Sequence, residues 1–429
     1  MTTTYDPHHP KYYDETDMRE ELTRVYELCQ GCRMCVNYCP SFPTLFDAVD
    51  RHDLKTEDLT IAEQDQVVDE CFQCKICYVK CPYVPPHEWE LDFPRLMLRA
   101  TATRKKDQGV TLTDRALAQT DLIGKISTAL APLANASLGT PGSFPRKIME
   151  KVVGVAAQRI LPLYTGERFS AWFKKRGSKP TETERTVALF PTCLMEYQDP
   201  SVGHDAVKVY ERNKIACTLP EGQQCCGIPW LDQGNVANFQ KLARENIAVL
   251  ADSVRAGQDI VVLQPTCGYV LKKEYPAHVP TEDSRLVAEH TYDVSEYLMK
   301  VHREREGGLD KGFTGTVPET VTWHAPCHLR AQEIGFKSRD LIRLTGAQVK
   351  IVDKCSGIDG TWGLRAENYL LAKKVAQPLK EAIESQNSQA VAGDCRLANN
   401  VIFEETGRTA KHPVQLVARA YGIPEEPGS

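Results

Sequence analysis

The sequence predicts an α/β fold in which an all-helical N-terminal domain precedes two duplicated α/β domains related by a pseudo-twofold axis. Two observations lead to this fold class. A Cys-x2-Cys-x2-Cys-x3-Cys-Pro motif occurs twice near the N-terminus. From residue 185 onward, short apolar runs alternate with helical stretches, which is typical of parallel sheets covered by helices. Three landmarks of this second region recur in the same order further along the chain.

Length and composition limit the class of protein. At 429 residues, with 42% apolar and 25% charged residues, the chain is expected to be soluble and to form more than one domain. The N-terminus shows no secretory signal, and no run of 18 apolar residues occurs. We therefore expect a cytoplasmic protein, with a peripheral position on the inner face of the membrane left open. The net charge of -5 says little by itself. No nucleic-acid partner is expected.

The sixteen cysteines indicate metal ligation, because disulfides are rare in proteins without an export signal. Both N-terminal motifs have the spacing of bacterial ferredoxins, in which the fourth cysteine of each motif binds the other motif's 4Fe-4S cluster. The expected ligand sets are Cys29, Cys32, Cys35 and Cys81 for one cluster, and Cys71, Cys74, Cys77 and Cys39 for the other. Structural zinc prefers paired cysteine knuckles. Zinc and a disulfide framework are the weaker interpretations.

The N-terminal domain is expected to span residues 1–105. Residues 1–13 are polar and suggest a disordered arm. Apolar residues at helical spacing predict a helix from Asp14 to Leu28, and a second helix is expected from Trp89 to Ala100. The insert between the motifs, residues 41–70, is polar and prone to helix. We therefore expect the all-helical type of two-cluster ferredoxin domain.

A connecting segment without cysteine is expected at residues 106–184. Two weakly amphipathic helical stretches are expected in it, from Leu117 to Leu133 and from Ile148 to Leu163. Basic residues outnumber acidic ones between Arg146 and Lys179. The segment is expected either to pack against the neighbouring domain or to lie in the headgroup region of an anionic membrane.

The first α/β domain is expected at residues 185–310 and the second at residues 311–429. Strands are predicted at residues 187–190, 215–219 and 260–263, and helices at residues 201–212 and 236–255. The recurring landmarks are Val187–Phe190 with Cys193 and Val321–Trp323 with Cys327; Cys225-Cys226-Gly227-Ile228 and Cys355-Ser356-Gly357-Ile358; and Val261–Leu263 with Cys267 and Ala390–Ala392 with Cys395. Their order and near-constant offset indicate an internal duplication.

The cysteines of these domains follow the predicted strands. In open α/β sheets, sites form beyond the carboxyl ends of the strands. The first repeat offers four thiolates for a further iron-sulfur cluster, namely Cys193, Cys225, Cys226 and Cys267. Buried structural cysteines are the alternative, and we assign that role to Cys217, which lies in a predicted strand.

The second repeat is degenerate. It keeps Cys327, Cys355 and Cys395, while Ser356 replaces the second member of the cysteine pair. Either a cluster here has an open or non-sulfur position, for which Ser356, His324 and His328 are the candidates, or the site has decayed into structure.

The two ferredoxin motifs followed by two cysteine-rich repeats of the Cys-Cys-Gly type resemble the family of the C subunit of anaerobic glycerol-3-phosphate dehydrogenase. The iron-sulfur subunit of glycolate oxidase and heterodisulfide reductase are relatives of that family. The segments Pro265-Thr266-Cys267-Gly268 and Ala288-Glu289-His290-Thr291 are similar to segments of the dehydrogenase protein. Ser356 and Ala398 depart from the pattern of heterodisulfide reductase, which places a second cluster of that kind in doubt.

The chain has no Gly-x-Gly-x-x-Gly turn and no phosphate loop, so it offers no site for a hydride carrier. We expect an electron-transfer subunit of an oxidoreductase complex, which links a flavoprotein dehydrogenase or other redox protein to a terminal acceptor. The resemblance implies that this acceptor is a quinone. The alternative is a reductase that acts on a disulfide or similar substrate with its own active-site cluster in the first Cys-Cys-Gly repeat, and a zinc-stabilised scaffold is the non-redox alternative.

Overall fold

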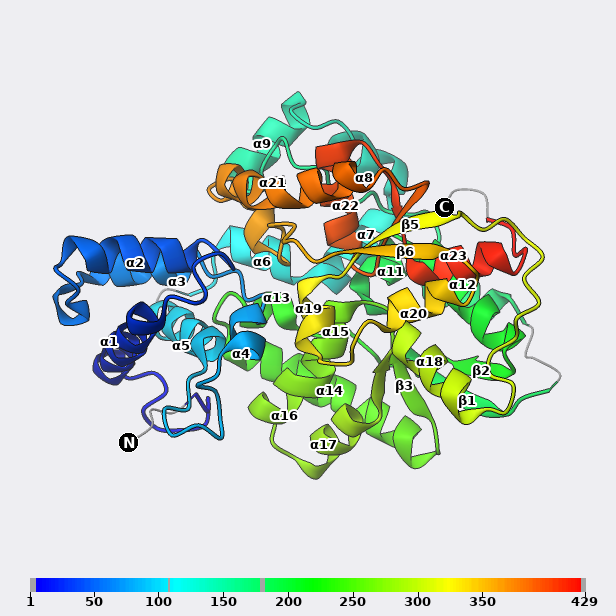
Figure 1. Ribbon diagram of the computed structural model, residues 1–429, viewed down its shortest axis with the longest axis horizontal. Coiled ribbons are helices and arrows are strands. Elements are labelled where there is room, and N and C mark those ends of the chain that lie inside the picture. The colour runs from blue at the N-terminus through cyan, green and yellow to red at the C-terminus, as the bar shows by residue number, and fades with distance from the viewer. Residues whose placement is uncertain (1–4, 107–108, 178–181, 426–429) are drawn as a thin grey trace.

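The chain is described here by a computed structural model, which covers residues 5–106, 109–177 and 182–425. A helical body formed by the first hundred residues lies at one end of the long axis, and two four-stranded parallel sheets occupy the rest of the molecule (Figure 1). The predicted fold class is confirmed. No helix among the described residues is long and apolar enough to cross a membrane.

The N-terminal body is helical, as predicted. Its elements are α1 (Glu15–Cys32), α2 (Ser41–Arg51), the 3-10 turn η1 (Thr56–Asp58), α3 (Ile61–Asp69), α4 (Ile76–Lys80) and α5 (Phe93–Lys105). Helix α1 begins after Asp14, whose carboxylate accepts a hydrogen bond from the backbone N–H of Asp17. The side chains at helical spacing, Met18, Leu22 and Val25, are fully buried in the core of this body.

The expectation of a disordered arm is wrong for residues 5–13, and residues 1–4 lie outside the described part of the chain. Tyr12 is buried, and the Arg99 guanidinium donates to the carbonyl oxygen of Tyr12. Arg99 also forms an ion pair of 2.7 Å with Asp17. His8 reaches the carbonyl oxygen of His278 in the first repeat. The arm is therefore ordered although its sequence is polar, because the buried Arg99 side chain binds its backbone.

The connecting segment contains α6 (Leu112–Ala118), α7 (Thr120–Ala129), α8 (Ala131–Leu138), α9 (Phe144–Val153) and α10 (Phe169–Lys175). The stretch predicted as helical from residue 117 to 133 is divided among α6, α7 and α8, and α8 carries a proline in its first turn. The stretch from residue 148 to 163 is helical only up to Val153. Gly154 ends it with φ of 67°, a left-handed conformation that suits glycine.

The first sheet has the strand order β2-β1-β3-β4, with β1 (Arg185–Phe190), β2 (Ile215–Thr218), β3 (Asp259–Val262) and β4 (Thr291–Asp293). All its pairs are parallel. Alternate residues of β3 face opposite layers. Ile260 and Val262 pack with α14 (Val236–Arg255) and α17 (Glu282–Glu289), whereas Val261 packs with α12 (Pro200–Arg212) and α18 (Val294–Glu304). Cys217 lies buried in this second layer.

The second sheet repeats this topology in the order β6-β5-β7-β8, with β5 (Thr320–His324), β6 (Gln348–Val352), β7 (Ala390–Gly393) and β8 (Ala410–Lys411). Its helices are α19 (Cys327–Ala331), α20 (Lys337–Arg343), α21 (Tyr369–Gln386), α22 (Arg396–Thr406) and α23 (Pro413–Ala420). The two repeats contact each other through α12 and α23 and through α18 and α20. In both sheets the cysteine-bearing loops follow the carboxyl ends of strands.

Candidate metal centres

The first ferredoxin-type motif meets the end of the second in space. Cys29 lies in the last turn of α1, and Arg33 ends that helix with φ of 51°, which redirects the chain and leads to Cys35. Burial raises the pKa of the Cys29 thiol, and the neighbouring thiols of Cys35, Cys81 and Cys32 raise it further. Cys81 thus lies beside the cysteines of the other motif.

The remaining four ferredoxin-type cysteines form a second group. Burial raises the pKa of the Cys77 thiol well above its usual range, and the thiols of Cys74, Cys39 and Cys71 add to the effect. Cys74 and Cys77 are buried. Two positive φ angles, 54° at Gln73 and 64° at Lys75, coil the loop from Cys71 to Cys77. The two groups also approach each other, because Cys35 affects the pKa of Cys77 and Cys74 affects that of Cys35, and the crossed ligand sets stay a prediction.

Polar side chains connect this second group to the first repeat. Gln73 Nε2 donates to Cys71 Sγ at 3.5 Å, and Lys75 Nζ donates to Gln73 Oε1 at 2.6 Å. Lys75 Nζ lies 3.5 Å from Glu274 Oε1, and both side chains are buried. The ammonium of Lys75 lowers the pKa of Glu274 to about 2 against the opposing effect of burial. A positive charge is therefore fixed in the loop that carries Cys71, Cys74 and Cys77.

The four cysteines of the first repeat form a chain of hydrogen-bonded thiols. Cys193 lies on α11 (Thr192–Tyr197), Cys225 and Cys226 precede α13 (Ile228–Leu231), and Cys267 lies on α15 (Pro265–Tyr269). Hydrogen bonds from the thiols of Cys193 and Cys226 lower the pKa of the Cys225 thiol well below its usual range. Cys226 also shares a hydrogen bond with Cys267, and its own pKa is raised.

Two backbone positions make this convergence possible. Gly227 has φ of 91°, and a Cβ added there would lie 2.9 Å from a ring carbon of Phe239. Thr192, which precedes Cys193, has φ of 69°, an unusual conformation for a β-branched residue. Strain of this kind persists where the surrounding structure enforces it, and it is frequent at functional sites.

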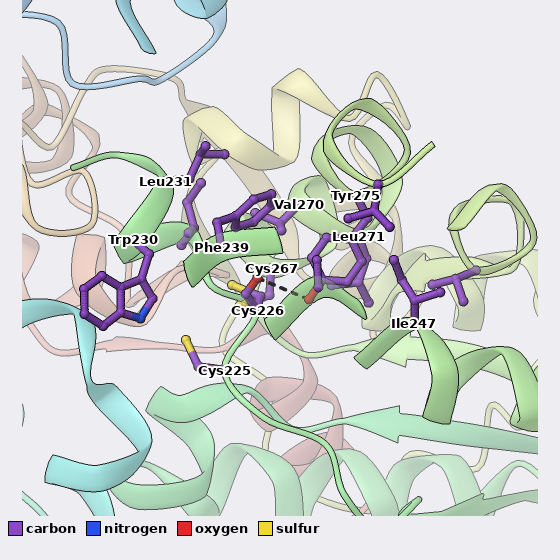
Figure 2. Packing of buried hydrophobic residues seen from close by; sticks show 14 of the residues in the cluster. Cys225, Cys226, Trp230, Leu231, Phe239, Ile247, Cys267, Val270, Leu271 and Tyr275 are labelled. Carbon is purple, nitrogen blue, oxygen red and sulfur yellow. Dashed lines mark hydrogen bonds between the residues drawn. The ribbon is translucent and has the colours of Figure 1, made fainter. Parts of the chain in front are cut away.

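The thiols of Cys225, Cys226 and Cys267 lie together at the edge of the first repeat's core (Figure 2). The hydroxyl of Tyr275 donates to the carbonyl oxygen of Cys226 at 3.1 Å, the hydrogen bond drawn in Figure 2. Asn246 Nδ2 donates to the carbonyl oxygen of Cys225 at 3.1 Å. The backbone between the two adjacent cysteines is thereby held from two helices.

A cavity of about 400 Å³ lies beside these thiols. Side chains of the connecting helices form its far wall, among them Ile123 of α7, Leu138 of α8 and Met149 of α9. Of the described residues that line it, none carries an ionisable acidic or basic side chain other than the cysteines and the two tyrosines, Tyr164 and Tyr197. On the side of the first repeat, Thr192 Oγ1 and Gln198 Oε1 line the cavity and are buried without a hydrogen-bond partner. The cavity therefore suits an uncharged, largely apolar molecule with a polar group.

The opposite faces of the same connecting helices are apolar and exposed. More than half of the large apolar side chains that the described residues expose lie between residues 112 and 163. They are Leu112, Leu122, Ile126, Leu130, Leu133, Phe144, Ile148, Val152 and Leu163. We call these nine side chains the apolar roof. The spacing of Leu122 and Ile126 in α7, and of Leu130 directly after it, places them on one side of that helix. Exposed apolar patches of this kind mark interaction surfaces.

Basic residues accompany the apolar roof, but fewer than the sequence suggested. Lys125, Lys147 and Lys151 are exposed on α7 and α9. Arg146 is instead fully buried, where it donates to three backbone carbonyl oxygens. Arg159 is buried in an ion pair of 3.0 Å with Glu404. Lys179 lies outside the described residues.

The three cysteines of the second repeat come together at the corresponding edge of the second sheet. Burial raises the pKa of the Cys327 thiol, and Cys74, Asp359, Cys355 and Cys395 add to the effect. Gly357 N donates to Cys355 Sγ at 3.3 Å, and Gln264 Nε2 donates to Cys395 Sγ at 3.1 Å. The thiols line a cavity of about 250 Å³ that Cys74 of the helical body also lines.

The histidine and serine candidates of this site behave differently from one another. His328 uses both ring nitrogens, with Nε2 3.1 Å from the carbonyl oxygen of Gln73 and Nδ1 3.0 Å from Thr266 Oγ1. His324 Nε2 donates to the carbonyl oxygen of Lys354, and its Nδ1 is buried without a partner. Ser356 is half-buried and lines the cavity.

Asp359 was not anticipated from the sequence. Its carboxylate, Cys327 Sγ and a ring nitrogen of His328 lie within 4.8 Å of one another. Burial and the nearby Asp232 carboxyl raise the pKa of Asp359. The only sequence signal is its place four residues after Cys355, in the loop that the repeat alignment already singles out.

The donor sets fit iron-sulfur clusters. Clusters are held by cysteine thiolates, and hydrogen bonds to their sulfurs tune the potential. Three of the four groups contain four thiols, and N–H groups point at Cys71, Cys355 and Cys395. Cys217 stays apart from all four groups.

Comparison with known proteins gives a consistent result. Residues 187–272 and 321–397 each match the cysteine-rich domain family CCG, and residues 22–109 match the Fer4-like domain of citrate utilization protein B. The two CCG matches begin at the first strand of each sheet. The Fer4-like match contains both ferredoxin-type motifs.

Three characterised groups of proteins resemble larger parts of the chain. The C subunit of anaerobic glycerol-3-phosphate dehydrogenase of Escherichia coli is 28% identical over 316 residues, which are 72% of this chain and 77% of that protein. Lactate utilization protein A of Shouchella clausii is 28% identical over 54% of this chain and 98% of its own length. The B subunit of fumarate reductase (CoM/CoB) of Methanothermobacter marburgensis is 27% identical over 49% of this chain and 40% of its own length.

Proposed function

The chain belongs to the family of CCG-domain iron-sulfur proteins related to the C subunit of anaerobic glycerol-3-phosphate dehydrogenase, and we propose that it transfers electrons from a flavoprotein or other redox protein to a quinone. One observation carries the proposal. Every cysteine except Cys217 joins one of four groups, and three of these groups have four thiols. Bound clusters would supply one-electron centres, with potentials that depend on charge, hydrogen bonds and exposure.

We assign three 4Fe-4S clusters to the three four-thiol groups. The first would be held by Cys29, Cys32, Cys35 and Cys81, the second by Cys71, Cys74, Cys77 and Cys39, and the third by Cys193, Cys225, Cys226 and Cys267. The mutual effects of the thiols on each other's pKa support these sets. The full chain should then contain at least about twelve irons.

Replacement of one crossed ligand tests the two ferredoxin-type sets. Cys39→Ser should weaken the cluster of Cys71, Cys74 and Cys77, because Cys39 neighbours those thiols. It should spare the cluster of Cys29, Cys32 and Cys35, although these cysteines are nearer in sequence. Iron analysis and electron paramagnetic resonance of the anaerobic protein measure both. Loss of the nearer cluster would reverse the assignment, and the absence of iron and sulfide from the wild type would remove the electron-transfer function.

The cavity beside the first-repeat thiols is the proposed quinone site. Its uncharged lining suits a quinone better than a charged disulfide, for which it offers no counter-charge. The Thr192 hydroxyl, buried without a partner, could donate to a quinone carbonyl oxygen there. The connecting helices carry both one wall of this cavity and the apolar roof. If the apolar roof lies on a membrane, a lipid-soluble molecule in that membrane is close to the cavity. The apolar roof and its lysines are accordingly the surface that we expect to lie on an anionic bilayer.

Variants at two adjacent residues of α7 test membrane binding and quinone binding separately. Leu122 is exposed in the apolar roof, whereas Ile123 lines the cavity. Leu122→Glu should reduce binding to vesicles with anionic lipid by about tenfold or more, because a buried apolar side chain is worth about 2 kcal/mol. Ile123→Trp should leave vesicle binding intact and slow the reoxidation of the reduced protein by a water-soluble short-chain quinone.

The two variants are each other's control. Vesicle flotation reports the first effect, and recovery of the oxidised protein's absorbance after quinone addition reports the second. If Leu122→Glu binds vesicles as the wild type does, the apolar roof is not the membrane surface. If Ile123→Trp reacts with the quinone at the wild-type rate, the cavity is not the quinone site.

A further inference from the structure

The second repeat lacks one thiol, and the loop that lost it has gained a carboxylate beside the remaining three. We propose that Asp359 is the fourth protein ligand of a cluster held by Cys327, Cys355 and Cys395. The inference rests on the iron-sulfur function proposed above. The second repeat would then be a cluster site with three sulfur donors and one oxygen donor, and not a decayed site.

Position within the repeat is the first argument. The landmark Cys225-Cys226-Gly227-Ile228 is followed by Pro229, and the equivalent Cys355-Ser356-Gly357-Ile358 is followed by Asp359. Where the first repeat has two adjacent cysteines, the residue after isoleucine has no donor atom in its side chain. Where the second cysteine is a serine, the same position carries a carboxylate. The donor is thus moved three residues along the loop.

The shape of the loop turns Asp359 back toward the thiols. Positive φ angles of 66° at Gly357 and 45° at Gly360 flank it, and Asp359 itself has φ of 20°. Gly363 N donates to the carbonyl oxygen of Ile358 at 2.8 Å, and Trp362 N donates to that of Asp359 at 2.9 Å. These bonds fix the backbone on both sides of the carboxylate. One of its oxygen atoms then lies within 4.8 Å of Cys327 Sγ, at the wall of the cavity that Cys355 and Cys395 also line.

The Asp359 carboxylate has no other function in the described structure. It makes no hydrogen bond and no ion pair with any residue among 5–106, 109–177 and 182–425, although it is half-buried where it lines the cavity. Asp353 provides a contrast, because it lines the same cavity at an exposed position and lies 3.7 Å from Arg330. A half-buried carboxylate without a partner is costly while it is ionised, so it either takes up a proton, as the raised pKa of Asp359 indicates, or binds something positive.

The other candidates are weaker on geometry. The carbonyl of Gln73 can only accept, so His328 Nε2 must carry the proton, and Nδ1 then accepts from the Thr266 hydroxyl. Neither nitrogen of His328 is left for a metal. His324 has a buried Nδ1 without a partner, but its neighbouring charges are Arg330 and Asp353 and not the cysteines. Asp359, by contrast, has a carboxylate oxygen within 4.8 Å of Cys327 Sγ. Its charge raises the pKa of the thiols of Cys327, Cys355 and Cys395, and also those of Cys71 and Cys74 in the helical body.

Replacement of the carboxylate by a thiol or a methyl group tests the inference on the full chain. With Asp359 as ligand, the anaerobically reconstituted wild type should contain about sixteen irons, four for each cluster. Asp359→Ala should lose one iron from the second-repeat cluster and show the electron paramagnetic resonance signal of an oxidised three-iron cluster. Asp359→Cys should keep the iron and release it to a chelator more slowly than the wild type. Asp353→Asn, the matched control, should leave iron content and spectra unchanged.

The outcomes separate this inference from the proposed function. If Asp359→Ala keeps the wild-type iron content and spectra, Asp359 is not a ligand. If Ser356→Ala or His324→Gln shows the three-iron signal and Asp359→Ala does not, that serine or histidine is the fourth ligand and the inference is overturned. In both cases the clusters of the three four-thiol groups remain, and the electron-transfer function stands. Only a wild type without iron-sulfur spectra would remove both.

Discussion

The thiol groups of the two repeats occupy equivalent places on equivalent sheets, yet their surroundings differ. The thiols of the first repeat are joined by hydrogen bonds and face an uncharged cavity beneath the apolar roof. Those of the second repeat receive N–H hydrogen bonds from Gly357 and Gln264 and face a cavity that Cys74 of the helical body shares. One site adjoins the proposed acceptor surface, and the other adjoins the ferredoxin-type thiols.

The comparison shows what a duplicated domain preserves. Strand order, parallel pairing and the positions of the cysteine loops are the same in both repeats. The donors at one loop differ, as do the elements that cover each site. The shared scaffold therefore fixes where a cluster can lie, whereas a few loop residues determine the ligands of that cluster. The elements that cover each site determine which partner can exchange electrons with the cluster.

The largest expected effect comes from converting the first repeat's donor set into that of the second. Cys226→Ser removes the thiol that connects Cys225 to Cys267, and Pro229 has no donor to replace it. We expect the first-repeat cluster to be lost or reduced to three irons, a loss of about one to four irons per chain. Iron analysis with electron paramagnetic resonance measures it.

A double variant sharpens this comparison. Cys226→Ser with Pro229→Asp reproduces the Ser-Gly-Ile-Asp order of the second repeat and should recover part of the lost iron. Cys217→Ala serves as the control, because that buried cysteine lies in β2 away from the sites and its removal should leave iron content unchanged. Wild-type iron content in Cys226→Ser would show that Cys226 is not a ligand.

The sequence predicted the fold class because its two signals are local. Ligand spacing in the ferredoxin motifs and the alternation of strands with helices do not depend on distant contacts, and the structure confirms the resulting fold. Strands β4, β6 and β8 were not predicted. In β4 and β8, two or three residues carry too little periodicity, and β6 contains exposed residues at Gln348, Lys350 and Ile351. All three are edge strands: β4 pairs with β3, β6 with β5 and β8 with β7.

The parts that sequence reasoning missed depend on long-range contacts. The polar arm is ordered by Arg99, a residue far along the chain. Two of the basic residues taken as candidates for lipid binding, Arg146 and Arg159, are buried against backbone carbonyls and Glu404. Asp359 has no spacing rule that marks it as a ligand, because only the fold brings its loop to Cys327 and Cys395. A carboxylate near a cysteine motif is otherwise an ordinary solvated residue.

The second-largest expected effect is on the free energy of unfolding, and it differs between the glycines of the two cysteine loops. An added Cβ at Gly357 would clash with the carbonyl oxygen of Ala372, which is backbone and cannot move away alone. At Gly227 the nearest atom, at 2.9 Å, belongs to the side chain of Phe239. Both have positive φ angles, so both alanine variants are strained. We expect Gly357→Ala to lower the free energy of unfolding by about 3 kcal/mol and Gly227→Ala by about 1–2 kcal/mol.

Denaturant unfolding of both variants under anaerobic conditions measures this difference. Gly407→Ala is a suitable control, because it has a positive φ of 69° but no atom within 4 Å of the added Cβ. It therefore reports the backbone strain alone. If Gly357→Ala is no less stable than Gly407→Ala, the close contact with Ala372 does not constrain the second cysteine loop.

The smallest effect concerns equivalent helix caps in the two repeats. Asp293 caps α18 after β4, and His412 caps α23 after β8. Burial lowers the pKa of His412 to about 3, whereas burial and Asp394 raise that of Asp293 to about 8. The unfolded chain binds a proton at His412 below about pH 6.5, while the folded chain does not until about pH 3. Stability from this cap is thus complete above about pH 6.5 and is lost as the pH falls toward about 3.

Asp293 should act in the opposite direction. Its folded pKa lies above the unfolded value, so stability is complete below about pH 4 and is lost as the pH rises toward about 8. Asparagine at either position keeps a capping oxygen but cannot titrate. His412→Asn should therefore reduce the loss of unfolding free energy between about pH 7 and pH 5 by about 1–2 kcal/mol. Asp293→Asn should reduce the loss between about pH 5 and pH 7. If the two variants shift the pH profile in the same direction, the caps do not titrate as their burial requires, and the two repeats are electrostatically more alike than their sequences indicate.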